Sequence, residues 1–152
     1  QKYVMFSDDD CYYVKGWDES IEKVLEAYDR CVVSGHAHPF NHSIGRYVRR
    51  NVVVEAANVL STVNIAMDWH IWDEVGCWIE PGGPGGSEDV EWCKRATNTQ
   101  EGCGLAVTMP QCVIHTGLTS SRGEPIVGAD MVRERNRELE TIHNIIGQVV
   151  YS

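Results

Sequence analysis

Hydrophobic and polar side chains alternate most clearly between residues 64 and 72, and we expect the fold to be organised around this stretch. The apolar residues occupy every second position, at Ile65, Met67, Trp69 and Ile71. Because a strand sends successive side chains to opposite faces, the pattern predicts a central strand with one apolar face. The other face would carry Asp68 and His70 side by side.

Two stretches instead show the spacing of an amphipathic helix. In the first, one helical face would be formed by Ile21, Val24, Leu25 and Tyr28. The second runs from about residue 130 to 146, and Gly147 follows it as a stop signal. We therefore expect two helices packed against a part of the chain that is rich in strands.

Short runs of β-branched and aromatic residues predict those strands. They cover residues 3–6, 11–14, 31–33, 44–60 with a turn near 58–62, 105–109, 112–115 and 149–151. The runs on either side of Pro110 are expected to pair with each other, whereas the Gly-rich and Pro-rich residues 81–87 form a loop. The pattern predicts one β-rich α+β domain over residues 1–152, a small β-barrel or sandwich of short antiparallel strands with two helices.

The cysteine content changes this picture, because it adds covalent cross-links to the expected fold. No Cys-x-x-Cys pair is present among the six residues, which are Cys11, Cys31, Cys77, Cys93, Cys103 and Cys112. An even number at long, irregular spacings predicts three disulfides in a secreted protein and leaves their pairing open. A chain that starts at Gln1 rather than Met fits a processed mature form.

The net charge excludes some partners. The formal charge is −9 with neutral histidines, and such an acidic chain binds nucleic acid and anionic membranes poorly. No apolar run is long enough to cross a membrane. We therefore expect neither a nucleic-acid partner nor membrane insertion, and we expect a monomer.

Three histidines lie within seven residues, at His36, His38 and His42, and imidazole is a common ligand of zinc and copper. Asp68 or His70 would complete such a site if the fold brought them near. Metal ligands usually lie on rigid elements, whereas this stretch is rich in Gly, Pro and Asn and predicts a loop. We interpret it as a polar surface loop and expect no metal site and no cofactor.

A second set of residues would suit the acid–base chemistry of a small nuclease-like hydrolase, namely Asp68, His70 and His115. Arginines that would hold a phosphate lie earlier in the sequence, at Arg46, Arg49 or Arg50. Such combinations arise by chance in a chain with six histidines and 22 acidic residues, and no Gly-x-Ser-x-Gly motif is present. We therefore expect no enzymatic activity and a function in binding through residues 36–42, 81–87 and 119–124.

In its mass of 17.1 kDa, its six cysteines and its start at Gln1, the chain resembles the necrotrophic effectors that wheat-infecting blotch fungi release from pro-proteins. The resemblance implies a barrel-like fold, secretion into the plant apoplast and no enzymatic activity. It also implies that the protein binds a host susceptibility protein, and a secreted pathogenesis-related protein, and so triggers cell death or suppresses defence. A small secreted hydrolase and a protease inhibitor are the alternatives.

Overall fold

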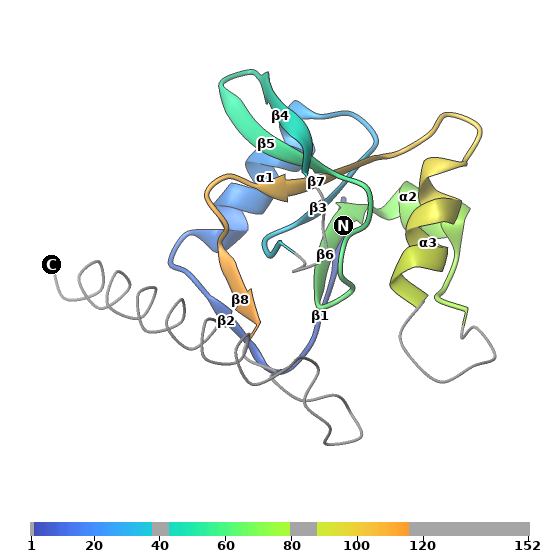
Figure 1. Ribbon diagram of the computed structural model, residues 1–152, viewed down its shortest axis with the longest axis horizontal. Helices are drawn as coiled ribbons and strands as arrows, with labels where there is room; N and C mark the ends of the chain where they lie inside the picture. The colour runs from blue at the N-terminus through green and yellow to red at the C-terminus, as the bar shows by residue number, and fades with distance from the viewer. Residues whose placement is uncertain (1, 38–42, 80–87, 116–152) are drawn as a thin grey trace, which may run out of the picture.

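The computed structural model describes residues 2–37, 43–79 and 88–115, which form a mixed six-stranded sheet, a two-stranded sheet and three helices (Figure 1). The strands are β1 Tyr3–Ser7, β2 Cys11–Tyr13, β3 Cys31–Ser34, β4 Ser43–Arg49, β5 Val52–Ala57, β6 Asn64–Asp68, β7 Gly104–Thr108 and β8 Val113–His115. The helices are α1 Trp17–Ala27, α2 Trp69–Val75 and α3 Glu88–Thr97.

The large sheet is open, with strand order β1-β6-β3-β7-β5-β4. The β3–β7 pair is parallel, and the other pairs of this sheet are antiparallel. An α+β fold is therefore confirmed, but the expected barrel or sandwich is wrong because β1 and β4 end the sheet as separate edges. Helices α2 and α3 cover one apolar face, and α1 covers the other together with residues of the small sheet such as Val113.

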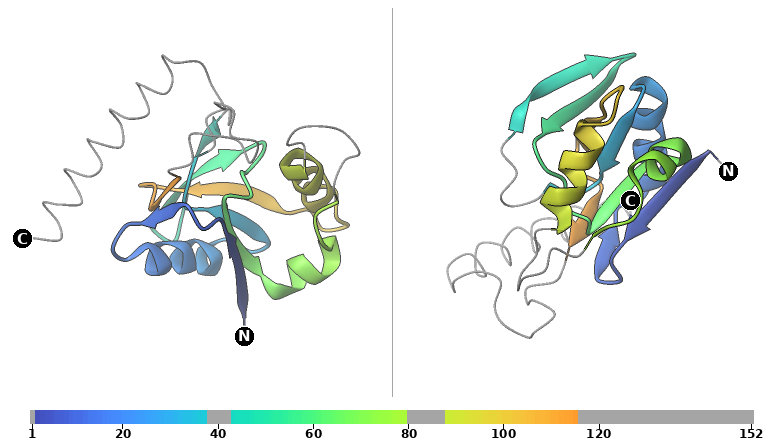
Figure 2. Two further views of the ribbon diagram at one scale, coloured as in Figure 1. Left: turned by 90° about the horizontal axis from the view of Figure 1, so that it is seen from below. Right: turned by 90° about the vertical axis from the view of Figure 1, so that its right-hand side faces the viewer.

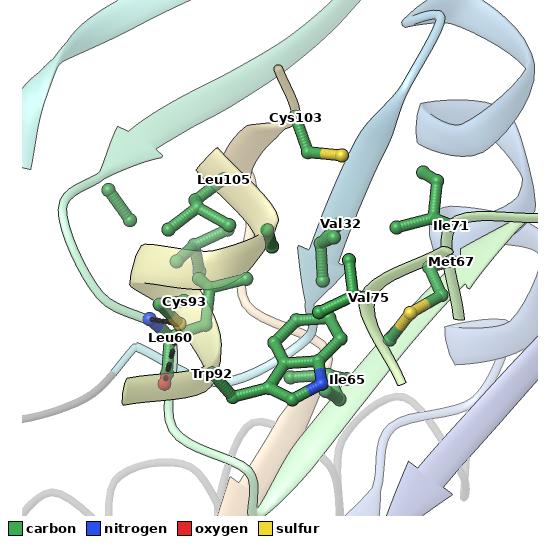
Figure 3. Packing of buried hydrophobic residues seen from close by; sticks show 13 residues of the cluster. Val32, Leu60, Ile65, Met67, Ile71, Val75, Trp92, Cys93, Cys103 and Leu105 are labelled. Carbon is green, nitrogen blue, oxygen red and sulfur yellow. Dashed lines mark hydrogen bonds between the residues drawn. The ribbon is translucent and has the colours of Figure 1, made fainter. Parts of the chain in front are cut away.

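Alternate residues of the central strands supply two hydrophobic cores, one on each face of the sheet. On one face, Val32 and Met67 pack with residues of α2 and α3, including the fully buried Trp92 (Figure 3). On the other face, Val33 and Ala66 pack with Ile21 and its neighbours on α1. The two helices on the first face lie next to one another, whereas α1 is separate from them (Figure 2).

The strand expected over residues 64–72 is shorter than its alternating pattern predicts. β6 ends at Asp68, whose side chain accepts a hydrogen bond of 2.9 Å from the backbone N–H of His70 and so caps the start of α2. Within α2, Ile71 and Val75 lie four residues apart and are both buried, while Trp69 is 48% exposed. The prediction was wrong after residue 68 because the alternation continues by coincidence into the first turn of a helix.

The predicted strands between residues 44 and 60 are present, but their hairpin turn lies elsewhere. Arg50 and Asn51 connect β4 to β5 with φ values of 51° and 64°. Two successive positive φ values are typical of a two-residue hairpin turn. The predicted turn near residues 58–62 instead follows β5 and leads into β6.

The strands on either side of Pro110 also exist, but they do not pair with each other. β7 lies between β3 and β5 in the large sheet, whereas β8 pairs with β2. Two backbone N–H groups, those of Cys112 and Val113, donate to the carbonyl oxygen of Gly35 at 2.9 and 3.0 Å. These bonds direct the chain away from the large sheet and into the second one.

All six cysteines are free thiols, so the three predicted disulfides are not formed. Four of the cysteine side chains are buried, and Cys31 and Cys93 are two of them. Burial raises the pKa of Cys31 to about 12 and the pKa of Cys93 to about 11. The four buried cysteines, which are Cys31, Cys93, Cys103 and Cys112, act as small apolar residues of the two cores.

Some expectations fall outside the described residues. They concern the helix near 130–146, the strand at 149–151 and the loops 81–87 and 119–124. Within the described ranges, no helix combines the length and the apolar character needed to cross a membrane.

Candidate metal centre

Two carboxylates and an imidazole converge at one end of the two-stranded sheet. Asp8, Asp10 and His115 each offer one ligand atom, and these atoms all lie within 4.8 Å of one another. The Nε2 atom of His115 lies 3.1 Å from Oδ1 of Asp10. Two carboxylate oxygens and one imidazole nitrogen at this spacing can hold a divalent cation.

Strand pairing brings the three residues together although they lie far apart in the chain. β1 ends at Ser7, and the turn that contains both aspartates leads directly into β2. β2 and β8 lie side by side, with Cys11 opposite His115 (Figure 1). The residue before Cys11 is Asp10, so the register of this pair places its carboxylate beside the imidazole.

Hydrogen bonds hold the turn formed by residues 8–10 in place. The backbone N–H of Asp8 donates to the carbonyl oxygen of Val63 at 2.8 Å, in the segment that precedes β6. The hydroxyl of Ser7 donates to the carbonyl oxygen of Asp8 at 3.2 Å, and the hydroxyl of Tyr13 donates to that of Ser7. The ligand atoms therefore start from a backbone with little freedom to rearrange.

The electrostatics of the turn favour a cation. Burial raises the pKa of Asp8, and the negative charges of Asp10, Asp89 and Asp9 raise it further, while His115 opposes them. Burial first, and the neighbouring carboxylates second, thus disfavour the ionised form of Asp8. A bound divalent cation would supply the missing positive charge.

Helix α3 contributes a further carboxylate to this region. Asp89 lies in its first turn, is half-buried, and is close enough to Asp8 for its charge to affect the pKa of that residue. The hydroxyl of Thr62 donates to Oδ1 of Asp89 at 2.5 Å. Helix α3 was not predicted from the sequence, so neither was this residue.

The histidine-rich stretch approaches the centre through one residue. The ring of His36 is 3% exposed, and its centroid lies 6.0 Å from that of His115 in an edge-on arrangement. His38 and His42 lie outside the described residues. The sequence therefore indicated a region near the candidate metal centre, but its three candidate ligands come from other elements.

The proposed acid–base set is not assembled. In the antiparallel pairing of β6 with β1, Asp68 lies opposite Tyr3 at the start of β1. Asp8 instead follows the other end of β1. Asp68 and His70 line an open pocket of about 320 Å³ with residues of α1, and His115 is not among its lining residues. Of the three residues, the structure places only His115 in the metal centre.

The arginines expected to hold a phosphate lie in the hairpin of β4 and β5, at the opposite edge of the large sheet from β1. Arg49 forms an ion pair of 3.0 Å with Asp29. Arg50 donates to the carbonyl oxygen of Glu26 at 2.9 Å. The two arginines therefore connect the hairpin to α1 and to the residues that follow this helix.

Neither a protein-family model nor a curated protein matches this chain. The resemblance to fungal effectors therefore stays a prediction, as do secretion and the binding of a host protein.

Proposed function

We propose that this chain is the catalytic part of a transferase that depends on a divalent cation and uses a donor with a diphosphate leaving group, such as a nucleoside-diphosphate sugar. The observation that carries the proposal is the convergence of Asp8, Asp10 and His115 within 4.8 Å. Two carboxylates with one imidazole suit Mn²⁺ or Mg²⁺ better than the thiolate-rich sets that select zinc.

The number of protein ligands supports a substrate that carries phosphates. Mg²⁺ and similar cations prefer about six ligands, and proteins usually supply one or two carboxylates while substrate phosphates supply others. Three protein ligands leave positions open for two oxygens of a diphosphate and for water. A diphosphate chelates one cation through neighbouring phosphates, which a single phosphate ester does less well.

The described residues favour transfer over the two-metal hydrolysis of a phosphodiester. Enzymes of that kind hold two cations about 3.5–4 Å apart. Among the residues that the structure describes, one group of metal-ligating side chains is found, and it has three members. The net charge of −9 also disfavours a nucleic-acid substrate.

In the proposed reaction, an acceptor hydroxyl attacks the donor carbon that is bonded to the diphosphate oxygen. The new carbon–oxygen bond forms as the old one breaks, and the diphosphate leaves with the electron pair. Asp8, Asp10 and His115 would hold the cation, which would balance the charge that develops on the leaving group. Asp89 accepts the proton of the acceptor hydroxyl as general base.

The effector hypothesis receives no further support from the described residues. Its premise of three disulfides is not met, because all six cysteines are free. The nuclease-like alternative relied on Asp68 with His70 or His115. Asp68 and His70 line one pocket, and His115 is not among its lining residues. An activity centred on Asp8, Asp10 and His115 therefore replaces both as our proposal.

The proposal is tested by calorimetric titration of nucleoside diphosphates into the protein with and without Mn²⁺, followed by assays of diphosphate release from a panel of nucleotide sugars. We expect binding and release that require the cation and that Asp10→Asn abolishes. The matched control Asp9→Asn, in the same turn, should retain both. Binding without Mn²⁺ dependence, or equal loss in both variants, would refute the proposal.

A further inference from the structure

The segment formed by residues 60–63, between β5 and β6, contacts both parts of the proposed catalytic site. The carbonyl oxygen of Val63 accepts the backbone N–H of Asp8 at 2.8 Å. The adjacent Thr62 donates its hydroxyl to Asp89 at 2.5 Å. One short segment thus connects the metal-binding turn to the first turn of α3.

The same segment is anchored to α3 at a second point. The backbone N–H of Leu60 donates to the sulfur of Cys93 at 3.3 Å, and that thiol in turn donates to the carbonyl oxygen of Leu60 at 3.6 Å (Figure 3). Leu60 and Cys93 are both buried. Because of this anchor, the side chain of Thr62 starts from a backbone that is fixed relative to the helix.

The bond between Thr62 and Asp89 has the length of a charge-assisted one. Hydroxyl donors to an ionised carboxylate lie about 2.5–2.7 Å from it and bind more strongly than neutral pairs. The bond restricts the rotation of the carboxylate, and a general base needs such a fixed position beside the proton it accepts.

Asp89 differs in this respect from the other acidic residues at the start of α3. Glu91 is bound by Arg95 of the same helix at 2.6 Å, and this neighbour lowers the pKa of Glu91. Asp89 instead receives its hydrogen bond from an element outside the helix, and its charge acts on Asp8. The position of Asp89 is therefore linked to residues 60–63. Glu91 is instead held by Arg95 of its own helix, which also donates to the carbonyl oxygens of Val75 and Cys77.

We propose that Thr62 is a positioning residue, which holds the carboxylate of Asp89 at a fixed place relative to Asp8 and so to the bound donor. The inference rests on the proposed function, in which Asp89 accepts the acceptor proton. Thr62 itself does not touch the reacting atoms. Its loss should therefore lower the rate of the chemical step and leave donor and cation binding intact.

The test compares Thr62→Val, which keeps the shape but loses the hydroxyl, with Thr62→Ser, which keeps the hydroxyl. For cation-dependent release of the nucleoside diphosphate, Thr62→Val should lower kcat by about 10–100-fold, because small misplacements of catalytic groups cost that much. The donor KM and the Mn²⁺ affinity should stay within about twofold, as expected when only transition-state interactions are lost. Thr62→Ser should restore most of kcat.

The chain offers a matched control on the same helix. The hydroxyl of Thr97 donates to the carbonyl oxygen of Cys93 at 3.0 Å, at the end of α3 away from Asp89. Thr97→Val makes the same chemical change and should leave kcat unaltered. The decrease in kcat caused by Asp89→Asn is the largest decrease that Thr62→Val should be able to cause.

The outcomes separate the inference from the function on which it rests. If Asp89→Asn is inactive while Thr62→Val retains full kcat, the positioning role is wrong and the proposed function stands. If Thr62→Val loses donor affinity and thermal stability together, and Thr62→Ser restores both, the hydroxyl is structural only and the positioning role is wrong. If the wild-type protein shows no cation-dependent release, the proposed function fails and the inference fails with it.

Discussion

The molecule contains two pairs of an aspartate and a histidine, and they differ in how the chain brings them together. Asp68 and His70 lie two residues apart, and the carboxylate binds the backbone N–H of that histidine rather than its ring. Asp10 and His115 come from opposite ends of the described chain, yet the carboxylate lies 3.1 Å from the imidazole. Closeness in sequence produces a helix cap, whereas strand pairing produces a candidate site.

The surroundings of the two pairs differ as well. The Asp68 carboxylate satisfies a backbone group at the start of α2, a local structural role. Asp10 instead lies beside Asp8, in a turn where the pKa of Asp8 is raised by burial and by neighbouring carboxylates. Acidic charge is thus concentrated beside the second pair. This difference supports a function at the turn and a structural role at the cap.

The largest expected effect is on cation binding at the turn. Asp10→Asn should lower the Mn²⁺ affinity at least about 100-fold, since even the outer partners of metal ligands contribute about 10–100-fold. Titration calorimetry measures this change directly. Asp68→Asn should leave the affinity unaltered, and an equal loss in that variant would remove the distinction between the two pairs.

A second variant tests whether the pairing of β8 creates the site. A Cβ atom added at Gly35 would lie 2.5 Å from Cγ2 of Val113 and 2.9 Å from the sulfur of Cys112. Gly35→Ala should therefore displace the start of β8, destabilise the protein by about 1–3 kcal/mol and lower the Mn²⁺ affinity about tenfold through the loss of ligand geometry. Denaturant unfolding and calorimetry measure the two effects.

The matched control is Gly104→Ala, where the added atom would lie 4.0 Å from its nearest neighbour, the carbonyl oxygen of Arg30. It should leave the cation affinity unaltered. If Gly35→Ala retained full affinity despite the close contacts, the position of His115 would not depend on the path into β8.

A smaller effect is expected at the helix cap. Asp68→Ala should destabilise the protein by about 1 kcal/mol, the usual contribution of an N-cap side chain. For a chain of this size this lowers Tm by about 2–5 °C, which differential scanning calorimetry resolves. Cation binding should not change. His70→Ala should have almost no effect on Tm, because the cap uses only the backbone of that residue.

The smallest effect concerns pH in the absence of divalent cations. Because the pKa of Asp8 is raised in the folded protein, the folded state binds more protons than the unfolded state just above the ordinary range of a carboxyl group. The contribution of Asp8 to stability is therefore present at low pH and lost as pH rises through this window.

Asp8→Asn should consequently be at least as stable as the wild-type protein near pH 7 in a chelating buffer, and this advantage should disappear towards low pH. Thermal unfolding at several pH values provides the comparison. Added Mn²⁺ should raise the Tm of the wild-type protein alone. A variant that is less stable than the wild type at pH 7 would show that the Asp8 charge is not unfavourable.

The sequence predicted the elements whose apolar spacing is unambiguous. Helix α1 and the strands β1, β2 and β3 lie close to their expected positions, because their patterns involve only neighbouring residues. Helix α2 was missed, although Asp68 followed by Ile71 and Val75 carries the signal of a capped helix. Helix α3 was missed as well, although acidic residues in its first turn and Lys94 and Arg95 in its last are typical of a helix.

The candidate site was less predictable, for a physical reason. The acidic turn at residues 8–10 and the histidine at 115 are both visible in the sequence, but nothing local shows that they meet. Their association depends on the register between β2 and β8, strands of three residues each that lie at opposite ends of the described chain. The cysteines were misinterpreted because burial in a core and disulfide pairing leave similar patterns in a single sequence.

Anomalous diffraction from crystals grown with Mn²⁺ tests the metal centre most directly. We expect one strong anomalous peak within bonding distance of carboxylate oxygens of Asp8 and Asp10 and of an imidazole nitrogen of His115. The peak should disappear in Asp10→Asn crystals and persist in Asp9→Asn crystals. A peak at Asp68 and His70 instead, or none at the turn under saturating Mn²⁺, would contradict the assignment of this turn as the metal centre.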